Sequence, residues 1–312
     1  IYHTYLGLKK AFVFADATPG FEDVLFNCMK ANDFWVYIGR YYGRFEGCYG
    51  IYTVPAAHSE QFEEFVNQLG ETGITQRIRL KWSTCLQSVN LKEKWFKVYM
   101  EKGSFPWDRW IDEIPKKNPE LPPTLKEPKD FPIKADEKDL YILAELEIDS
   151  TKRLREIAKT LGLTPETVSY HYKNHILKRG LIEKSSIFFF RFDKAVSDFF
   201  VFIFRFSTEE KMAKFASSLL DKPFVYSLGK IMGENGLIAH IYLPREEFRK
   251  FIEALSKLIK RGFLDTYEYL IEDYAKSQAQ TISFEYFKDG VWIYDHKRHL
   301  ENLKKELMKL KI

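Results

Sequence analysis

The feature that most constrains the fold of this chain is an internal repeat. Residues 12–55 align with residues 201–244 without a gap, at a constant offset of 189 positions. Each copy reads as an apolar strand, a helix, an aromatic strand, a tight glycine turn and a strand that ends in proline. A second amphipathic helix follows in both copies, and Gly73 and Gly262 each precede a closing strand. The repeat therefore predicts two βαββαβ units, each an antiparallel sheet with two helices on one face, of ferredoxin-like type.

Composition indicates a globular protein with more than one domain. The chain has 312 residues, of which 45% are hydrophobic and 29% charged, which is enough for two or three cores. No apolar run approaches the roughly 20 residues of a membrane-spanning helix, and the start does not resemble a signal peptide. Cys28, Cys48 and Cys85 form no CxxC pair, so neither a disulfide framework nor a zinc ribbon is indicated. We therefore expect a cytoplasmic protein with reduced thiols and no membrane partner.

A proline-rich segment separates the two copies. Seven of the twelve prolines fall between Pro106 and Pro132, a density that disfavours regular helix and favours extended backbone. The segment also holds Phe105, Trp107 and Trp110, and aromatic side chains in such number seldom stay in water. We predict an extended strap that packs on a neighbouring domain.

Short helices are predicted between the strap and the second copy. Residues 154–161 place four apolar side chains at i, i+3, i+4 and i+7, the pattern of an amphipathic helix. Gly162 ends this helix, and Thr164 with Pro165 begins the next as an N-cap hydroxyl and a first-turn proline. From Gly180, the sequence GLIEKSSIFFFRF reads as the strands of a wing. Together these signals predict a winged helix-turn-helix, and the fold class is α+β with this domain flanked by two ferredoxin-like units.

Positive charge is concentrated in the same segment. Between residues 151 and 191, nine Lys or Arg stand against three Glu, so the local excess of six exceeds the net charge of +4 of the whole chain. We predict that the helix from Pro165 enters a DNA major groove. The residues predicted to read bases are Glu166, Thr167, Tyr170, His171, Lys173 and Asn174. The residues predicted to contact phosphates are Lys152, Arg153, Lys159, Lys178, Arg179 and Lys184.

The order of these elements resembles the Lrp/AsnC class of winged helix-turn-helix regulators, chiefly in their archaeal form. The resemblance rests on DEKDLYILAELEIDSTKRLREIAKTLGLTPETVSYHYKNHILKRGLIEK followed by a βαββαβ unit. It implies a homodimeric, DNA-binding transcription regulator without enzymatic activity, bound to the nucleoid, whose βαββαβ domains mediate assembly. The duplicated arrangement is more similar to large archaeal regulators, among them a recruitment factor for the basal transcription factor B, than to single-unit members. Neither glycine turn between the second and third strands carries the Asp that the class often has there, so an amino-acid effector is not carried over.

The two histidines of the recognition helix raise the alternative of a metal site. His171 and His175 lie four residues apart, the spacing of a two-histidine zinc site. No Cys, Asp or Glu stands three or four residues beyond them, and no HExxH is present. On a helical wheel that starts from Val168, His175 points to the core and His171 lies at the margin of the exposed face. The sequence therefore predicts no metal, no cofactor and no catalytic residue.

Two rival functions stay open at this stage. The winged helix could serve as a protein-interaction module that docks on the basal transcription machinery, with DNA contact secondary. A small-molecule sensor or enzyme on the βαββαβ fold is the third candidate, and it lacks paired acids, a nucleophile with its base, and a metal set.

The predicted boundaries follow from these patterns. The second copy is preceded by a winged helix whereas the first begins at Ile1, so we expect a further winged helix upstream of Ile1. A basic helix with Leu300, Leu303, Leu307 and Leu310 on one stripe is expected to dock at the end of the chain. The predicted segments are the first unit at 1–98, the strap at 99–135, the winged helix at 136–192, the second unit at 193–294 and the terminal helix at 295–312.

Overall fold

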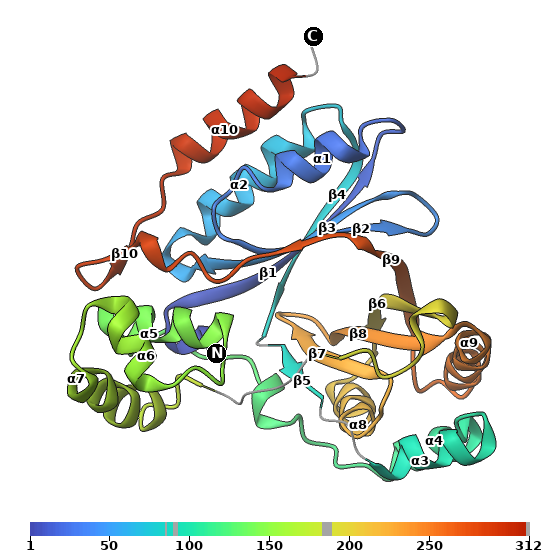
Figure 1. Ribbon diagram of the computed structural model, residues 1–312. Coiled ribbons are helices and arrows are strands. Elements are labelled where there is room, and N and C mark those ends of the chain that lie inside the picture. The colour runs from blue at the N-terminus through green and yellow to red at the C-terminus, as the bar shows by residue number, and fades with distance from the viewer. Residues whose placement is uncertain (85, 90–92, 183–188, 310–312) are drawn as a thin grey trace.

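The strands of both repeats share one large sheet. The computed structural model describes residues 1–84, 86–89, 93–182 and 189–309. Nine strands follow the order β4-β1-β3-β2-β9-β6-β8-β7-β5, with an additional pairing between β4 and β7 (Figure 1). A separate hairpin pairs β10 (Phe287–Lys288) with β11 (Val291–Trp292). Within the described residues, no helix is both long and apolar enough to span a membrane.

Both repeats form the βαββαβ unit that the sequence predicts. In each, the first and third strands are central, and the buried side chains of the second helix, such as Phe62, Phe65 and Leu69 in the first unit, pack on the sheet. The first unit consists of β1 (Leu8–Ala17), α1 (Glu22–Met29), β2 (Trp35–Tyr42), β3 (Gly47–Pro55), α2 (Ser59–Gly70) and β4 (Thr75–Ser83). The second consists of β6 (Ser197–Arg205), α8 (Glu209–Leu219), β7 (Val225–Ile231), β8 (Gly236–Pro244), α9 (Arg245–Lys260) and β9 (Thr266–Ala279).

The last strand of each unit extends onto the other unit, which the repeat alone did not predict. The long β9 pairs with β6 of its own unit and continues onto β2 of the first unit, where Tyr41 faces Glu272. The end of β4 reaches β7 through the pair Ser83–Ile231, and β5 (Gln87–Ser88) continues along the same strand. The two crossings have the same form, so the units are related by an approximate twofold arrangement within one chain.

A core of aromatic and aliphatic side chains fills the space between the joined units. Its side chains come from strands of both units and, because side chains alternate along a strand, lie on the face of the sheet opposite the helices. Its buried members are Phe12, Phe14, Tyr41, Tyr49, Ile51, Val201, Ile203, Ile231 and Ile238.

The strap packs on the second unit as predicted, but the prediction that it lacks helix was wrong. It contains α4 (Trp107–Glu113) and the 3₁₀ turns η3 (Ile114–Lys116) and η4 (Pro123–Leu125), and α3 (Glu93–Lys102) precedes it. Pro106 is the N-cap of α4, and Pro115 and Pro123 stand in the first turns of η3 and η4. Proline is tolerated at these positions because the first amide N–H groups of a helix have no partner within the helix.

The three-helix segment that was predicted to be a winged helix precedes the second unit in sequence but packs on the first. Its helices are α5 (Glu137–Ile148), α6 (Leu154–Leu161) and α7 (Pro165–Tyr170), which runs on into the π-helical turn η5 (His171–Leu177). Their shared core includes Leu6 and Phe34 of the first unit and Trp292 of the C-terminal hairpin. The Trp292 indole N–H also donates to the carbonyl of Leu6 at 2.6 Å. Residues 183–188, the middle six of the thirteen residues of the predicted wing, lie outside the described residues, and no strand is present in 180–182 or 189–192.

The terminal helix α10 (His296–Met308) docks on α1 and α2, as predicted (Figure 1). Leu303 is buried there, and Leu300 and Leu307 pack beside it, whereas Leu310 lies outside the described residues. Short 3₁₀ turns complete the fold at η1 (His3–Tyr5), η2 (Ala56–His58), η6 (Lys194–Val196) and η7 (Phe284–Tyr286).

Candidate nucleic-acid interface

Helices α6 and α7 pack against each other across a short turn that has the predicted glycine and threonine caps. Ile157 and Ala158 of α6 are buried in the contact with α7. Gly162 ends α6 in the left-handed region at φ 63°, where glycine alone avoids a steric penalty. The Thr164 hydroxyl then accepts the N–H of Thr167 at 3.2 Å and caps α7.

The outer face of α7 and its continuation presents four of the predicted base-reading residues. Glu166, Tyr170, Lys173 and Asn174 are exposed, and 57% of the Tyr170 surface is accessible although the side chain is largely apolar. A groove between α6 and this helix is lined by Glu166, Tyr170 and Lys173 together with Arg155 of α6. The sequence reasoning missed Arg155, although its position one residue after Leu154 on an amphipathic helix marks it as exposed.

Two polar groups on this face already have partners within the helix. The Thr167 hydroxyl lies 2.9 Å from that of Thr164, and Thr167 is only partly exposed. The Asn174 amide nitrogen donates to the carbonyl of Tyr170 at 3.2 Å, which leaves its amide oxygen outward. The Thr167 hydroxyl is therefore engaged at the helix cap, whereas the amide oxygen of Asn174 can still accept a hydrogen bond from a base.

The prediction for His171 is corrected by the structure. His171 was expected at the margin of the exposed face, but it is buried, and its Nδ1 lies 2.7 Å from Oδ1 of Asp139. His175 was expected to point to the core as a partly buried side chain, and it is partly buried. The packing of α5 against this helix covers the margin on which His171 lies. His171 is thus removed from the set of accessible reading residues.

Some of the cations predicted to contact phosphates are exposed to solvent, and others are held in contacts within the chain. Arg153, Lys159 and Lys178 are exposed. Lys152 forms an ion pair with Glu145, and the Arg179 guanidinium donates to the carbonyl of Lys134 at 2.6 Å. Lys184 lies outside the described residues.

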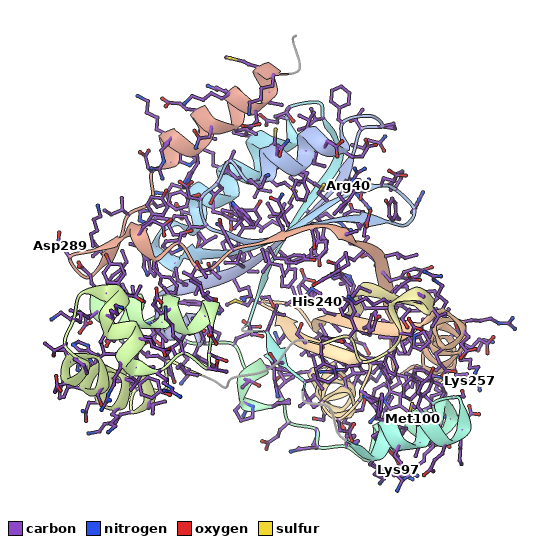
Figure 2. All side chains as sticks on the ribbon, in the orientation of Figure 1. Arg40, Lys97, Met100, His240, Lys257 and Asp289 are labelled. Carbon is purple, nitrogen blue, oxygen red and sulfur yellow. The ribbon has the colours of Figure 1, made fainter. Side chains whose placement is uncertain are left out.

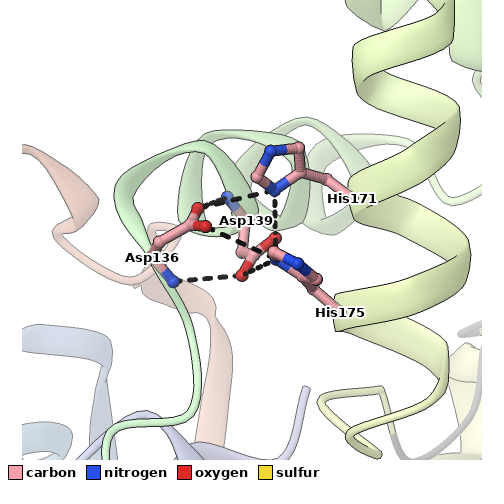
Figure 3. A group of neighbouring side chains, drawn as sticks. All are labelled: Asp136, Asp139, His171 and His175. Carbon is pink, nitrogen blue, oxygen red and sulfur yellow. Dashed lines mark hydrogen bonds and ion pairs between the residues drawn. The ribbon is translucent and has the colours of Figure 1, made fainter.

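The inner side of the same helix contributes to a compact group of two histidines and two aspartates (Figure 3). One potential ligand atom from each of Asp136, Asp139, His171 and His175 can be chosen so that all four lie within 4.8 Å of one another. Asp136 is the N-cap of α5 and Asp139 its third residue. Sequence reasoning missed both aspartates because they lie more than 30 residues before the histidines and only the helix packing brings them together.

A second polar group lies where the two units meet. The Glu272 carboxylate accepts hydrogen bonds from Tyr49, at 2.9 Å, and from Tyr37. His240, near the centre of Figure 2, places Nδ1 2.7 Å from the Ser227 hydroxyl. Burial raises the pKa of Glu272 and lowers that of His240 to about 4, so His240 is neutral at neutral pH.

Comparison with known proteins gives a fold but no close relative. No family model matches, and no curated protein sequence matches. The crystal structure of the siroheme decarboxylase NirDL aligns with 100% of this chain and 83% of its own, at a TM-score of 0.56 and 12% identity. An AsnC family transcriptional regulator from Agrobacterium tumefaciens aligns with 49% of this chain and 100% of its own (TM-score 0.40, 18% identity), and E. coli AsnC with 44% and 91% (0.33, 19%). The chain is an α+β protein that shares the fold of this siroheme decarboxylase structure along its whole length.

Proposed function

We propose that this protein is a DNA-binding transcription regulator in which α7 reads the major groove. The observation that carries the proposal is the accessible outer face of α7, where Tyr170, Lys173 and Asn174 stand beside Arg155 of α6. These side chains can stack, pair with phosphate or bond to base edges, and the N-terminal part of a recognition helix is the part that enters the groove.

The charge around this face supports the same proposal. Five exposed cations surround it, from α6, its N-cap, the recognition helix and the residues after it: Arg153, Arg155, Lys159, Lys173 and Lys178. Cations in these places suit phosphate contacts that set the position of the helix on the duplex. Each phosphate contact releases counterions, so affinity should fall steeply as salt rises.

A salt titration of DNA affinity tests the proposal. We expect the logarithm of the association constant to fall with the logarithm of salt concentration at a slope of roughly −3 to −5, since each contact contributes about −0.9. Replacing Arg155 and Lys159 by alanine should reduce the steepness by about two. Lys297→Ala is the matched control, because Lys297 is an exposed cation on the distant α10. A slope near zero contradicts the proposal and favours a protein partner for the winged helix instead.

Selection of binding sites from random DNA tests which residues read sequence. The double variant Tyr170→Ala/Asn174→Ala should lose preference at the bases under the recognition helix while keeping most of its nonspecific affinity. An unchanged preference would exclude these two side chains as reading residues.

A second function is favoured by the polar group at the junction of the units. Decarboxylation replaces a carboxylate by a proton, so it needs a proton donor near the reacting carbon. Burial raises the pKa of Glu272, which suits a carboxyl group that holds a proton. The match to a siroheme decarboxylase over the whole chain makes an anionic tetrapyrrole the substrate class to test.

Incubation of the chain with siroheme, followed by mass spectrometry of the pigment, tests this second function. The expected product has lost carbon dioxide, and Glu272→Gln should abolish its formation. Asp273→Asn is the matched control, because Asp273 is the next residue on β9 and bonds Tyr42 outside this group. Recovery of unchanged siroheme from the unmodified chain would exclude the activity.

A further inference from the structure

We infer that Asp136, Asp139, His171 and His175 form a binding site for a divalent transition-metal ion of the Zn²⁺ type, which joins the start of α5 to the recognition helix. The four side chains surround one point between the two helices (Figure 3). The inference does not rest on the proposed DNA binding, since it concerns ligands that face away from the outer surface of α7.

The two carboxylates are held in place, and each keeps one oxygen for a ligand. Oδ1 of Asp136 accepts the N–H of Asp139 at 2.9 Å, and Oδ2 of Asp139 accepts the N–H of Asp136 at 3.0 Å. This reciprocal capping box fixes both side chains on the first turn of α5. Oδ2 of Asp136 and Oδ1 of Asp139 then point to the histidines.

Both histidines direct their Nδ1 atom to these carboxylate oxygens. Nδ1 of His171 lies 2.7 Å from Oδ1 of Asp139 and 3.6 Å from Oδ1 of Asp136. Nδ1 of His175 lies 3.2 Å from Oδ1 of Asp139 and 3.4 Å from Oδ2 of Asp136. Four ligands at 2.0–2.2 Å from a tetrahedral ion stand about 3.3–3.6 Å apart, so the 2.7 Å pair of His171 and Asp139 must open and any ligand pair near the 4.8 Å limit of the group must close.

The π-helical turn from His171 is a second, independent feature of the site. Such turns are rare and occur frequently at functional sites. Here the turn begins at His171 and includes His175, so both histidines belong to it.

Charge and access also fit a divalent cation. The Asp139 side chain is fully buried, and a buried carboxylate needs compensation. Two carboxylates and two neutral imidazoles carry a formal charge of −2, which one divalent ion neutralises. Arg179 is the nearest cation outside the group, with Nη1 3.7 Å from Oδ2 of Asp139. The Asp136 side chain is 48% exposed and gives the ion a path from solvent.

Two nitrogen and two oxygen ligands select among metals. Neutral imidazole and carboxylate together suit Zn²⁺ and its neighbours in the first transition row, whereas Ca²⁺ and Mg²⁺ prefer oxygen alone. Because the imidazoles must be unprotonated to bind the ion, affinity should weaken in acid.

Calorimetric titration of the chelator-treated full chain with ZnCl₂ tests the inference. We expect one equivalent to bind and the melting temperature to rise with the concentration of free Zn²⁺, because the ion binds the folded state. MgCl₂ at the same concentrations should produce neither effect.

Variants separate this site from other histidine–carboxylate pairs of the chain. His175→Ala should weaken Zn²⁺ binding at least 100-fold, and its circular dichroism spectrum reports whether the fold persists. His296→Ala is the matched control, because His296 pairs with Glu64 on a different surface and should leave binding unchanged. Should His175→Ala fail to fold, Asp136→Asn at the half-exposed position provides the second variant, with at least tenfold weaker binding expected.

Three outcomes overturn the inference. These are the absence of saturable Zn²⁺ binding by the unmodified chain, unchanged affinity in folded His175→Ala or Asp136→Asn, and loss of the single equivalent in His296→Ala. DNA affinity measured with and without Zn²⁺ is a separate experiment, so failure of the proposed function leaves this result standing.

Discussion

The two βαββαβ units cover the outer faces of their helices with different chemistry. On the second unit the strap inserts Trp107 and Trp110 among Phe215, Phe224 and Phe251, with ring centroids 5.1–6.5 Å apart. On the first unit α10 contributes one buried leucine, Leu303, and a polar end. Because the underlying units share one topology, the difference lies in the covering segments and not in the repeat.

The strap and α10 are each held by one carboxylate of the unit on which they pack. Glu247 of α9 accepts from the Trp107 indole at 2.9 Å and from the Phe105 amide at 3.0 Å. Asp33 accepts from His299 of α10 at 3.1 Å and pairs with Arg298. Besides its carboxylate, the strap is held by the buried aromatic contacts of Trp107 and Trp110, whereas α10 is held by few apolar contacts. We therefore expect α10 to separate from its unit far more readily than the strap.

The largest expected effect is at the strap. Trp110→Ala should lower the free energy of unfolding by about 3 to 5 kcal/mol, because it removes a fully buried indole and leaves a cavity. Denaturant unfolding of the two chains measures the difference. Trp110→Phe is the control: it keeps most of the packing and loses the 3.1 Å hydrogen bond to Ser218, so it should cost less. Equal costs for the two variants would contradict the packing explanation.

A smaller effect is expected under α10. Leu303→Ala should cost about 2 kcal/mol, at the low end for a buried leucine, because α10 can detach while the unit beneath it stays folded. Hydrogen exchange should then accelerate in α10 and remain unchanged in α4. Faster hydrogen exchange in both α10 and α4 would show that the two segments unfold together, which contradicts the expectation that α10 detaches alone.

The anchor of α10 should depend on pH. Burial raises the pKa of Asp33, but its hydrogen bond to His299 and the nearby Arg298 outweigh burial, so the pKa lies below the ordinary value of about 4. A lowered pKa in the folded state stabilises above that ordinary value, and the contribution is lost as pH falls through the folded pKa. Asp33→Asn should cost about 1 to 2 kcal/mol at neutral pH and flatten the acid limb of the stability curve. An unchanged acid limb would remove Asp33 from the anchor.

The smallest effect is expected at the rim of the strap. Lys257 and Asp108 lie 2.6 Å apart there, and both are largely exposed (Lys257 is labelled in Figure 2). Asp108→Asn should leave stability nearly unchanged, because exposed ion pairs contribute little and salt screens them. A clear shift of the denaturant midpoint to lower concentration would mean that ion pairs, and not aromatic packing, hold the strap.

The parts of the fold that sequence predicted are those with local signals. The repeat, the capped helix beginning at Thr164 and Pro165, and the stripe with Leu303 all depend on residues within a few turns of one another. The extension of β4 and β9 onto the opposite unit has no such signal, because strand pairing across more than 200 residues depends on the complete surfaces of both units. The helix α4 was missed because proline density was weighed without regard to position, although Pro106 stands at its N-cap.

The candidate site divides in the same way. Tyr170, Lys173 and Asn174 were predicted on the outer face and are exposed there. The aspartates that face His171 and His175 belong to another helix, so the spacing of residues along the chain does not predict them. The burial of His171 depends on the packing of α5 against its helix, and the periodicity of one helix cannot show that packing.

Strand β2 is synthesised long before β9, the strand of the second unit that pairs with it. Strand β2 is complete at Tyr42, but the β9 residues that pair with it begin at Ile271, about 230 positions later. At 5 to 20 residues per second the edge of β2 waits roughly 10 to 50 s for its partner on the ribosome. An unpaired edge strand is a template for wrong pairing, so this interval is when the nascent chain is most exposed to aggregation and most in need of a chaperone.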